Sequence, residues 1–148
     1  MMSNAPAPKM IFVNLPVKDL AASIAFYQAV GAVRNNDFAD DSTQMLSFSD
    51  TIHVMIMTHE RFTSFTPRKI PNAHETAQAL LALSENSRED VDATADKALA
   101  AGGTEPNPRQ DHGFMYGRSF ADLDGHIWEV AWMNMEAAMS AGQAETAA

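Results

Sequence analysis

Glu129 is the residue whose position most demands a chemical explanation, because it interrupts an otherwise apolar run near the end of the chain. The Asp-Gly pair at 124–125 is typical of a tight hairpin turn. In a strand that follows this turn, period-2 alternation places Glu129 on the face opposite Trp128 and Val130. Those two residues suit packing under a helix, so we expect Glu129 to face a concave ligand surface. The alternative is an acid paired with Arg118 or another cation.

The strand before that turn offers a second set of candidates. Tyr116 and Arg118 share one face with Phe114 and Phe120. If that face lines a ligand site, Arg118 orients a carboxylate or oxyanion and Tyr116 donates to a carbonyl. Otherwise the two Phe residues are core and Arg118 is a solvated strand end. His112, in the loop that precedes this strand, is either an acid or base near the site or without a role.

Composition excludes several classes of function. The chain has 148 residues, with 10 Lys and Arg against 19 Asp and Glu, and its formal net charge of −9 opposes binding to nucleic acid or an anionic membrane. It has no Cys, which excludes disulfides, thiolate metal sites and Cys nucleophiles. Gly-x-Ser-x-Gly, phosphate-cradling Gly-rich and His-Glu-x-x-His motifs do not occur.

Targeting and membrane signals are also missing from the sequence. No apolar run approaches the roughly 20 residues that a membrane-spanning helix needs. The N-terminus lacks the basic start and apolar block of a secretory signal. We therefore expect a cytoplasmic protein.

The elements that position these residues begin with a strand over 10–17. Asp19 is a candidate helix N-cap, and the helix that follows places Leu20, Ile24 and Tyr27 on one face before Gly31. One further strand is expected between residues 31 and 40. The runs 43–48 and 52–57 then have the spacing of an antiparallel hairpin.

The second half repeats this order with a shift of 71 residues. Residues 77–83 are strand-like, 87–90 resemble a capping box, and Val91, Ala95 and Ala98 reproduce the helical spacing. The sequence thus predicts an α+β fold of tandem β-α-β-β-β modules that form a curved mixed sheet with a concave ligand cup. The expected boundaries are an N-terminal tail 1–9, a first module 10–58, a connector 59–76, a second module 77–133 and an Ala-rich tail 134–148.

Two segments carry a resemblance to a known family. They are residues 15–27, Leu-Pro-Val-Lys-Asp-Leu-Ala-Ala-Ser-Ile-Ala-Phe-Tyr, and residues 120–129, Phe-Ala-Asp-Leu-Asp-Gly-His-Ile-Trp-Glu. With them the chain, from residue 10 to about 133, resembles the vicinal oxygen chelate superfamily of glyoxalases, bleomycin-resistance proteins and extradiol dioxygenases. The resemblance implies tandem modules, usually a homodimer, and in the enzymes a divalent metal held by one ligand from each of four strands.

The ligand positions that this resemblance implies are mostly occupied by residues that do not bind metals. They fall on Phe12, on Met55 and around Leu80, and only the fourth position, Glu129, carries a metal-binding side chain. One carboxylate does not hold a divalent ion, since zinc takes about four ligands and hard cations take about six or more oxygens. The expected cofactor is therefore either none or one divalent metal ion bound by substitute ligands.

His53 is the candidate substitute ligand. It lies two residues before Met55, on the same strand face, and a His53–Glu129 pair could be completed by His74 or His112. A lone His is more often a satisfied surface or turn residue than a ligand.

Three functions remain open from the sequence. The first is a small-molecule binding protein without a metal, for which the acidic balance favours a cationic or amphiphilic ligand. The second is a metal-dependent lyase or dioxygenase that uses Glu129 with His53. The third is metal-free acid–base catalysis by Glu129. In each, the candidate lining residues are Phe12, His53, Met55, His112, Tyr116 and Arg118.

Overall fold

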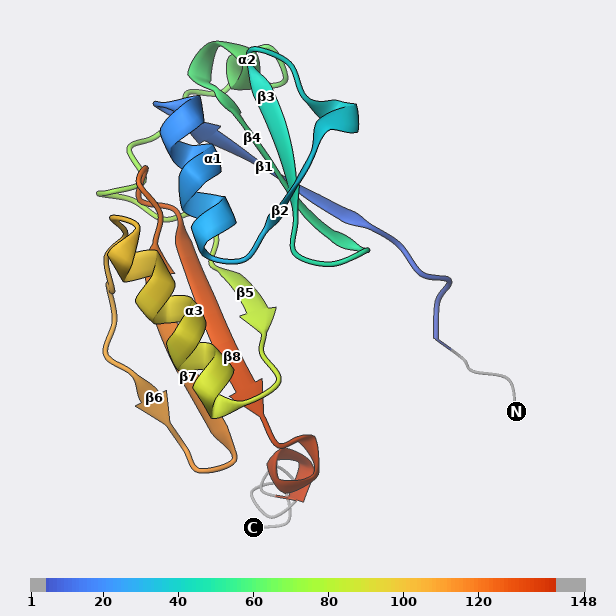
Figure 1. Cartoon of the computed structure of the whole chain (residues 1–148), viewed down its shortest axis with the longest axis vertical. Coiled ribbons are helices and arrows are strands. Elements are labelled where there is room, and N and C mark those ends of the chain that lie inside the picture. Colours follow the sequence, from blue (N-terminus) through green and yellow to red (C-terminus); the bar gives the residue numbers. More distant parts are fainter. Residues whose placement is uncertain (1–4, 141–148) are drawn as a thin grey trace. The chain divides into compact units, whose positions relative to one another are not determined.

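The computed structural model describes residues 5–140, which form two compact units that divide between Ile70 and Pro71. Each unit contains its own four-stranded mixed sheet with helical segments beside it (Figure 1). The α+β class and the β-α-β-β-β order predicted from the sequence are confirmed.

The first unit follows the predicted order of elements. Its sheet has the strand order β1-β4-β3-β2, with β1 parallel to β4 and the other pairs antiparallel. Its elements are β1 (Ile11–Val17), α1 (Leu20–Ala29), β2 (Val33–Asn35), the 3-10 helix η1 (Asn36–Phe38), β3 (Thr43–Ser47), β4 (Ile52–Thr58) and α2 (His59–Thr63).

The second unit repeats this topology, with the strand order β5-β8-β7-β6 and β5 parallel to β8. Its elements are β5 (Leu81–Ser84), α3 (Arg88–Ala100), β6 (Gln110–Asp111), β7 (Met115–Ala121) and β8 (Ile127–Met133). The internal repeat is therefore present in the fold. The strand expected from residue 77 begins only at Leu81, because residues 77–80 are not paired as strand.

Side-chain caps fix where the two long helices begin. The Asp19 carboxylate accepts a hydrogen bond from the backbone N–H of Ala22 at 3.1 Å, and Ser87 Oγ accepts one from the N–H of Asp90 at 3.0 Å. Three residues of α3 at the predicted 0, 4, 7 spacing are at most 1% exposed, and α3 packs on β7 and β8 (Figure 1). They are Val91, Ala95 and Ala98.

A buried ion-pair network joins α3 to β7. The Arg118 side chain is 1% exposed, and its Nη1 donates to Asp92 Oδ1 at 3.0 Å and to Asp96 Oδ1 at 2.9 Å, both on α3. Its Nη2 donates to Glu105 Oε1 at 2.9 Å. The Tyr116 hydroxyl also donates to Asp92 Oδ1, at 2.6 Å. The hydrogen bond that Arg118 donates to Glu105, with those that it donates to Asp96 and Asp92, raises the pKa of Arg118, so the guanidinium stays charged in spite of its burial.

Gly125 marks a close approach within the second unit. It has a φ of +94°, and a Cβ at this position would lie 2.6 Å from the backbone N of His74 and 2.7 Å from the carbonyl carbon of Ala73. Only Gly meets both demands. Residues 73–74, which the sequence placed in a connector, therefore pack against the turn of the β7–β8 hairpin.

The segment expected as an Ala-rich tail, 134–148, is helical over residues 135–140, and its remainder at 141–148 lies outside the described residues. Across residues 5–140, none of the helices combines the length and the apolar character that crossing a membrane requires.

We expect Arg118→Met to lower the free energy of unfolding by about 2–3 kcal/mol. This is below the range for fully buried pairs because Asp92 and Asp96 are partly exposed. Urea unfolding followed by circular dichroism measures the change. The matched control is Arg109→Met, because Arg109 is 56% exposed and its contact with Asp92 is a long one, at 4.0 Å. This variant should lower the free energy of unfolding by less than about 0.5 kcal/mol. Equal effects of the two variants would contradict the role assigned to Arg118.

Candidate functional site

Each sheet has one face that its long helix, α1 or α3, covers, and we call the opposite face of each sheet its open face. In the second unit Trp128 and Val130 are at most 2% exposed, on the face that α3 covers. Alternation puts Glu129 on the open face, where it pairs in register with Ser119 of β7 and Ala82 of β5. This is the orientation that the sequence pattern predicts for Glu129.

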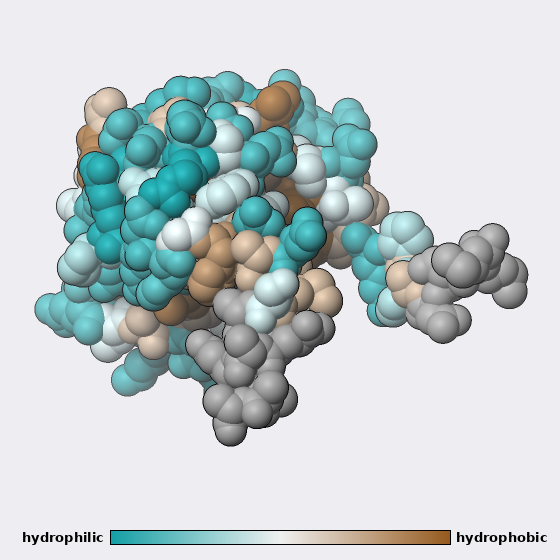
Figure 2. Space-filling view, turned by 90° about the horizontal axis from the view of Figure 1, so that it is seen from below, coloured by the Kyte–Doolittle hydropathy of each residue, from teal (hydrophilic) through white to brown (hydrophobic). Residues whose placement is uncertain are grey.

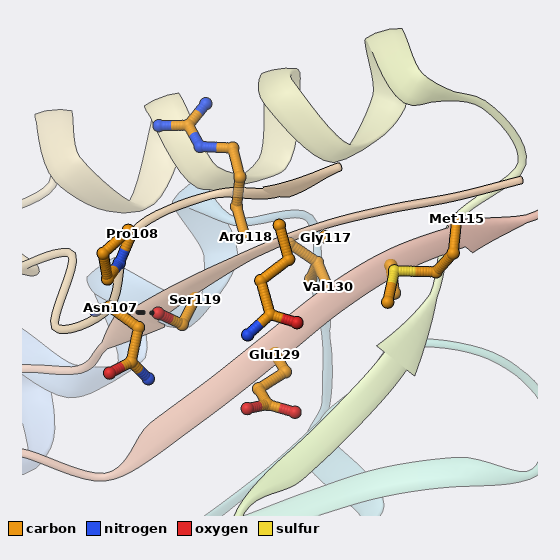
Figure 3. Close-up of a pocket in the computed structure, with 10 residues that line it drawn as sticks. Asn107, Pro108, Met115, Gly117, Arg118, Ser119, Glu129 and Val130 are labelled. Atoms are coloured by element: carbon orange, nitrogen blue, oxygen red, sulfur yellow. Dashed lines mark hydrogen bonds between the residues drawn. The ribbon is translucent and has the colours of Figure 1, made fainter. Parts of the chain in front are cut away.

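A cavity of about 80 Å³ lies on this open face, and we call it the Glu129 pocket. Its lining residues with polar side chains are Asn107, Gln110, Arg118, Ser119 and Glu129, and its apolar lining includes Met115, Gly117 and Ala131. Figure 3 shows the Glu129 side chain beneath the loop that carries Asn107, with Ser119 Oγ accepting a hydrogen bond from the backbone N of Asn107 at 3.3 Å. Within residues 5–140 the Glu129 carboxylate has no hydrogen bond or ion pair.

Arg118 and Tyr116 point to the opposite side of the sheet. Figure 3 shows the Arg118 guanidinium directed toward the helix and the Glu129 carboxylate directed away from it. Arg118 is engaged by acids of α3 and by Glu105, and Tyr116 by Asp92. Both side chains are therefore directed toward α3, although Arg118 is also among the residues that line the Glu129 pocket. Within residues 5–140 no ion pair joins Arg118 to Glu129. The face with aromatic and cationic residues is the one that packs under α3.

An ion pair holds the loop that borders the pocket. Arg88, at the start of α3, binds the Asp111 carboxylate, and its guanidinium lies 4.5 Å from the Tyr116 ring centroid. The Arg88 hydrogen bond lowers the pKa of Asp111 to about 2. The neighbouring His112 is exposed, stacks on Phe114 with ring centroids 6.3 Å apart, and is not among the residues that line the pocket.

The open face of the first unit has different chemistry. A cavity of about 310 Å³ is lined there by Asn14, Met55, Met57 and Phe65, together with Arg61, whose guanidinium lies 5.0 Å from the Phe65 ring centroid. The remaining lining residues belong to the segment 37–43. Met55, a predicted site residue, thus lies at a cavity whose floor has thioether groups.

His53 is held by hydrogen bonds on both sides of its ring. It is 6% exposed, Nδ1 lies 2.7 Å from Ser47 Oγ, and Nε2 lies 3.2 Å from the carbonyl oxygen of Asp50. A carbonyl only accepts, so Nε2 donates to Asp50, and Nδ1 is the ring nitrogen that pairs with the Ser47 hydroxyl. Phe12 stacks on the ring with centroids 5.0 Å apart. A metal could bind His53 only by displacing one of these partners.

The strand registers show where the four positions at which the resemblance implies metal ligands lie, two on or directly next to paired strands of each sheet. Met55 pairs with Asn14, and Phe12 lies two residues before Asn14. Glu129 pairs with Ala82, and Leu80 lies two residues before Ala82. Phe and Leu have no lone pair to donate and the Met thioether does not suit hard cations, so these side chains do not fit a divalent ion. Among residues 5–140 no group of three or more His, Asp or Glu is arranged to hold one.

Several lining residues carried little sequence signal. Ser119 of β7 lies directly opposite Glu129 of the neighbouring strand β8. Counting the hairpin register outward from the 124–125 turn would have predicted this pair. Asn107 comes from a loop with two Pro residues and no periodic pattern, and Gln110 from the two-residue strand β6 that follows this loop. Arg61 and Phe65 follow the first module without any motif. Only the fold brings these residues to the cavities.

Comparisons with known proteins agree with the fold. A family model described as the Glyoxalase/Bleomycin resistance protein/Dioxygenase superfamily matches residues 9–130. The structure of hypothetical protein SA1046 from S. aureus is 27% identical with a TM-score of 0.72, covering 86% of this chain and 95% of that one. Comparison with curated proteins found no significant match.

Two further solved structures show likeness in fold alone because their identity is low. A glyoxalase/bleomycin resistance protein/dioxygenase family enzyme from Burkholderia phytofirmans is 20% identical, with a TM-score of 0.68, covering 82% of this chain and 96% of that one. The fosfomycin resistance protein FosX from Listeria monocytogenes, complexed with Mn(II) and sulfate, is also 20% identical, with a TM-score of 0.62 and coverage of 91% and 94%.

The hydrogen bonds of His53 predict a structural role. We expect His53→Leu to lower the free energy of unfolding by about 1–2 kcal/mol, since Ser47 and Asp50 lose their partner. Urea unfolding measures this loss. His112→Leu, in an exposed turn, serves as the control and should change stability by less than about 0.5 kcal/mol. A His53 variant as stable as the wild type would contradict the structural role.

The Arg88–Asp111 pair predicts an acid-dependent stability. An acid whose pKa falls on folding stabilises the folded state above its ordinary value of 3.8, and the contribution is lost as pH falls toward about 2. We therefore expect Asp111→Asn to lower the melting temperature at neutral pH and to converge with the wild type near pH 2. Calorimetry across this range measures both. A constant difference at all pH values would contradict the assignment.

Proposed function

The chain belongs to the Glyoxalase/Bleomycin resistance protein/Dioxygenase superfamily, and we propose that it binds a small molecule on its open sheet faces without a protein-bound metal. The observation that carries the proposal is the Glu129 pocket, where a carboxylate that has no partner among residues 5–140 borders a cavity with hydrogen-bonding groups. Cavities of this kind, with a few convergent polar groups, are where proteins bind small ligands.

The residues at the implied metal positions support the metal-free form of the proposal. Phe12 stacks on His53 and Met55 lines the cavity of the first unit, so both positions offer contact surface for an organic ligand. Leu80 is 54% exposed and apolar. Apolar side chains at the positions implied for metal-binding residues favour binding of an organic molecule through dispersion and burial rather than through metal coordination.

The alternative functions each depend on Glu129. A metal-dependent lyase or dioxygenase would need His53 as a second ligand, and the hydrogen bonds of His53 to Ser47 and Asp50 weigh against it. Metal-free acid–base catalysis uses Glu129 alone and needs a substrate proton within its reach. The homodimer and the cytoplasmic location implied earlier are also part of the proposal, and light scattering of the purified protein tests the dimer.

Metal analysis tests the metal-free proposal. We expect protein purified without a histidine tag to hold far less than one equivalent of Ni, Zn, Mn or Fe by plasma mass spectrometry, and Glu129→Gln to leave that content unchanged. Added metal should produce no turnover of the hemithioacetal of methylglyoxal and glutathione. One bound metal per chain that is lost in Glu129→Gln, or metal-dependent turnover, would overturn the proposal in favour of the lyase.

A pocket-filling variant tests ligand binding. A Cβ added at Gly117 would lie 3.6 Å from the Val130 carbonyl oxygen and 3.7 Å from the Ala131 Cβ, which are ordinary contacts. Gly117→Leu should therefore fill the pocket without backbone strain. Fragments that bind the wild type by ligand-observed NMR should lose binding in Gly117→Leu and keep it in the exposed helix variant Ala100→Leu. A screen in which Gly117→Leu loses none of the wild-type binders would contradict the proposed site.

A further inference from the structure

We propose that the Glu129 pocket receives a positively charged nitrogen group of an organic ligand, a primary ammonium or an amidinium attached to a short apolar stem. This inference names the ligand class of the site in "Proposed function" and rests on that function. It follows from three features of the second unit, which are an uncompensated carboxylate, an acidic surrounding field and a lining that combines hydrogen-bond acceptors with small apolar side chains.

The first feature is that no Lys or Arg within residues 71–140 forms an ion pair with Glu129. Residues 71–140 contain four Lys and Arg residues. Arg118 is engaged by three carboxylates on the helix-covered side, and Arg88 by Asp111. Arg109 Nη1 lies 4.0 Å from Asp92 Oδ1, and Lys97 is in the last turn of α3. Within the described chain the carboxylate thus lacks an ion-pair partner, which a ligand can supply.

The second feature is the uneven distribution of charge along the chain. Residues 1–70 carry six acidic and six basic side chains and are neutral, whereas residues 71–140 carry twelve acidic and four basic ones. The net charge is therefore concentrated in the unit that holds the Glu129 pocket. A field of one sign over a cavity raises the local concentration of ligands of the opposite sign and disfavours anions.

The third feature is the chemistry of the lining. The Glu129 carboxylate and the side-chain oxygens of Asn107 and Gln110 are acceptors, and ammonium and amidinium groups have only donors to satisfy. Gly117 and Ala131 leave room on the floor, and the Met115 thioether offers an adaptable wall for an alkyl stem. A divalent metal would need several more anionic or imidazole ligands, whereas an organic cation needs only one carboxylate and a few neutral acceptors.

A matched series of small probes tests the charge preference. The backbone amides of the ¹⁵N-labelled protein are followed at constant ionic strength during titration with n-butylammonium, n-butanol and butyrate. We expect saturable shifts at Ser119, Glu129 and Ala131 with the cation, and at least about tenfold weaker binding of the neutral and anionic probes. That ratio corresponds to one charge-assisted hydrogen bond.

Three variants locate the effect. Glu129→Gln keeps the shape of the side chain and should weaken n-butylammonium binding about tenfold. Gly117→Leu should abolish it by filling the cavity. Glu89→Gln removes one exposed charge from α3, and because it lies outside the pocket it should weaken binding by less than about twofold. Unchanged heteronuclear spectra elsewhere in the protein show that each variant is folded.

The outcomes separate this inference from the proposed function. Cation-selective shifts that depend on Glu129 and Gly117 support the inference. If n-butanol or butyrate binds as well as n-butylammonium and Gly117→Leu still blocks binding, the ligand class is wrong while the small-molecule site stands. If none of the probes shifts the pocket amides, the inference is overturned, and the fragment screen with Gly117→Leu then decides the proposed function separately.

Discussion

The burial of Arg118 against α3 is the interaction on which the chemistry of the second unit depends. A guanidinium that is almost wholly buried needs its charge compensated, and the three carboxylates of Asp92, Asp96 and Glu105 supply this within hydrogen-bonding distance. The same contacts fix α3 over β7. They also hold the cation on the far side of the sheet from Glu129, so the open face keeps a carboxylate without a counter-ion (Figure 3).

Much of the fold was predictable because it follows from periodicity. The 0, 4, 7 spacing of Val91, Ala95 and Ala98 predicted the buried stripe of α3, and alternation around residue 129 predicted the face of Glu129. Alternation states which residues share a face but not which face a helix covers. The orientation of Tyr116 and Arg118 was missed for this reason, since their partner Asp92 lies on a helix more than 20 residues away in sequence.

The candidate site was less predictable, because its parts are joined by register and loops. His53 was a candidate ligand in the sequence, and its role became clear only when the β3–β4 register placed Ser47 opposite it. Asn107 reaches the pocket from a loop without periodic pattern. The resemblance to the family implied four positions for metal ligands. These positions were informative mainly because Phe12, Met55 and Leu80, which do not suit a divalent ion, stand at three of them.

The two units show how one topology supports different surfaces. Both have the same strand order and the same parallel pairing. The first is neutral, and its cavity of about 310 Å³ has Met and Phe walls, whereas the second is acidic, and its cavity of about 80 Å³ has a free carboxylate. Figure 2 shows the mixed character of one face, where hydrophobic residues are interspersed among hydrophilic ones. The same strand topology thus carries side chains of different charge and size on the two open faces.

The contact of Gly125 with residues 73–74 has a consequence for dividing the chain. The backbone of residues 73–74, which precedes β5 by several residues, covers the hairpin turn. The second unit therefore keeps all the contacts of this turn only if it includes the segment from Pro71 to β5. A fragment that starts at residue 77 would leave this turn uncovered and its tight geometry unsupported. The best place to cut the chain or insert a reporter is therefore between α2 and Pro71, because a break there keeps residues 73–74 packed on the turn. This holds for split-protein complementation and for circular permutation.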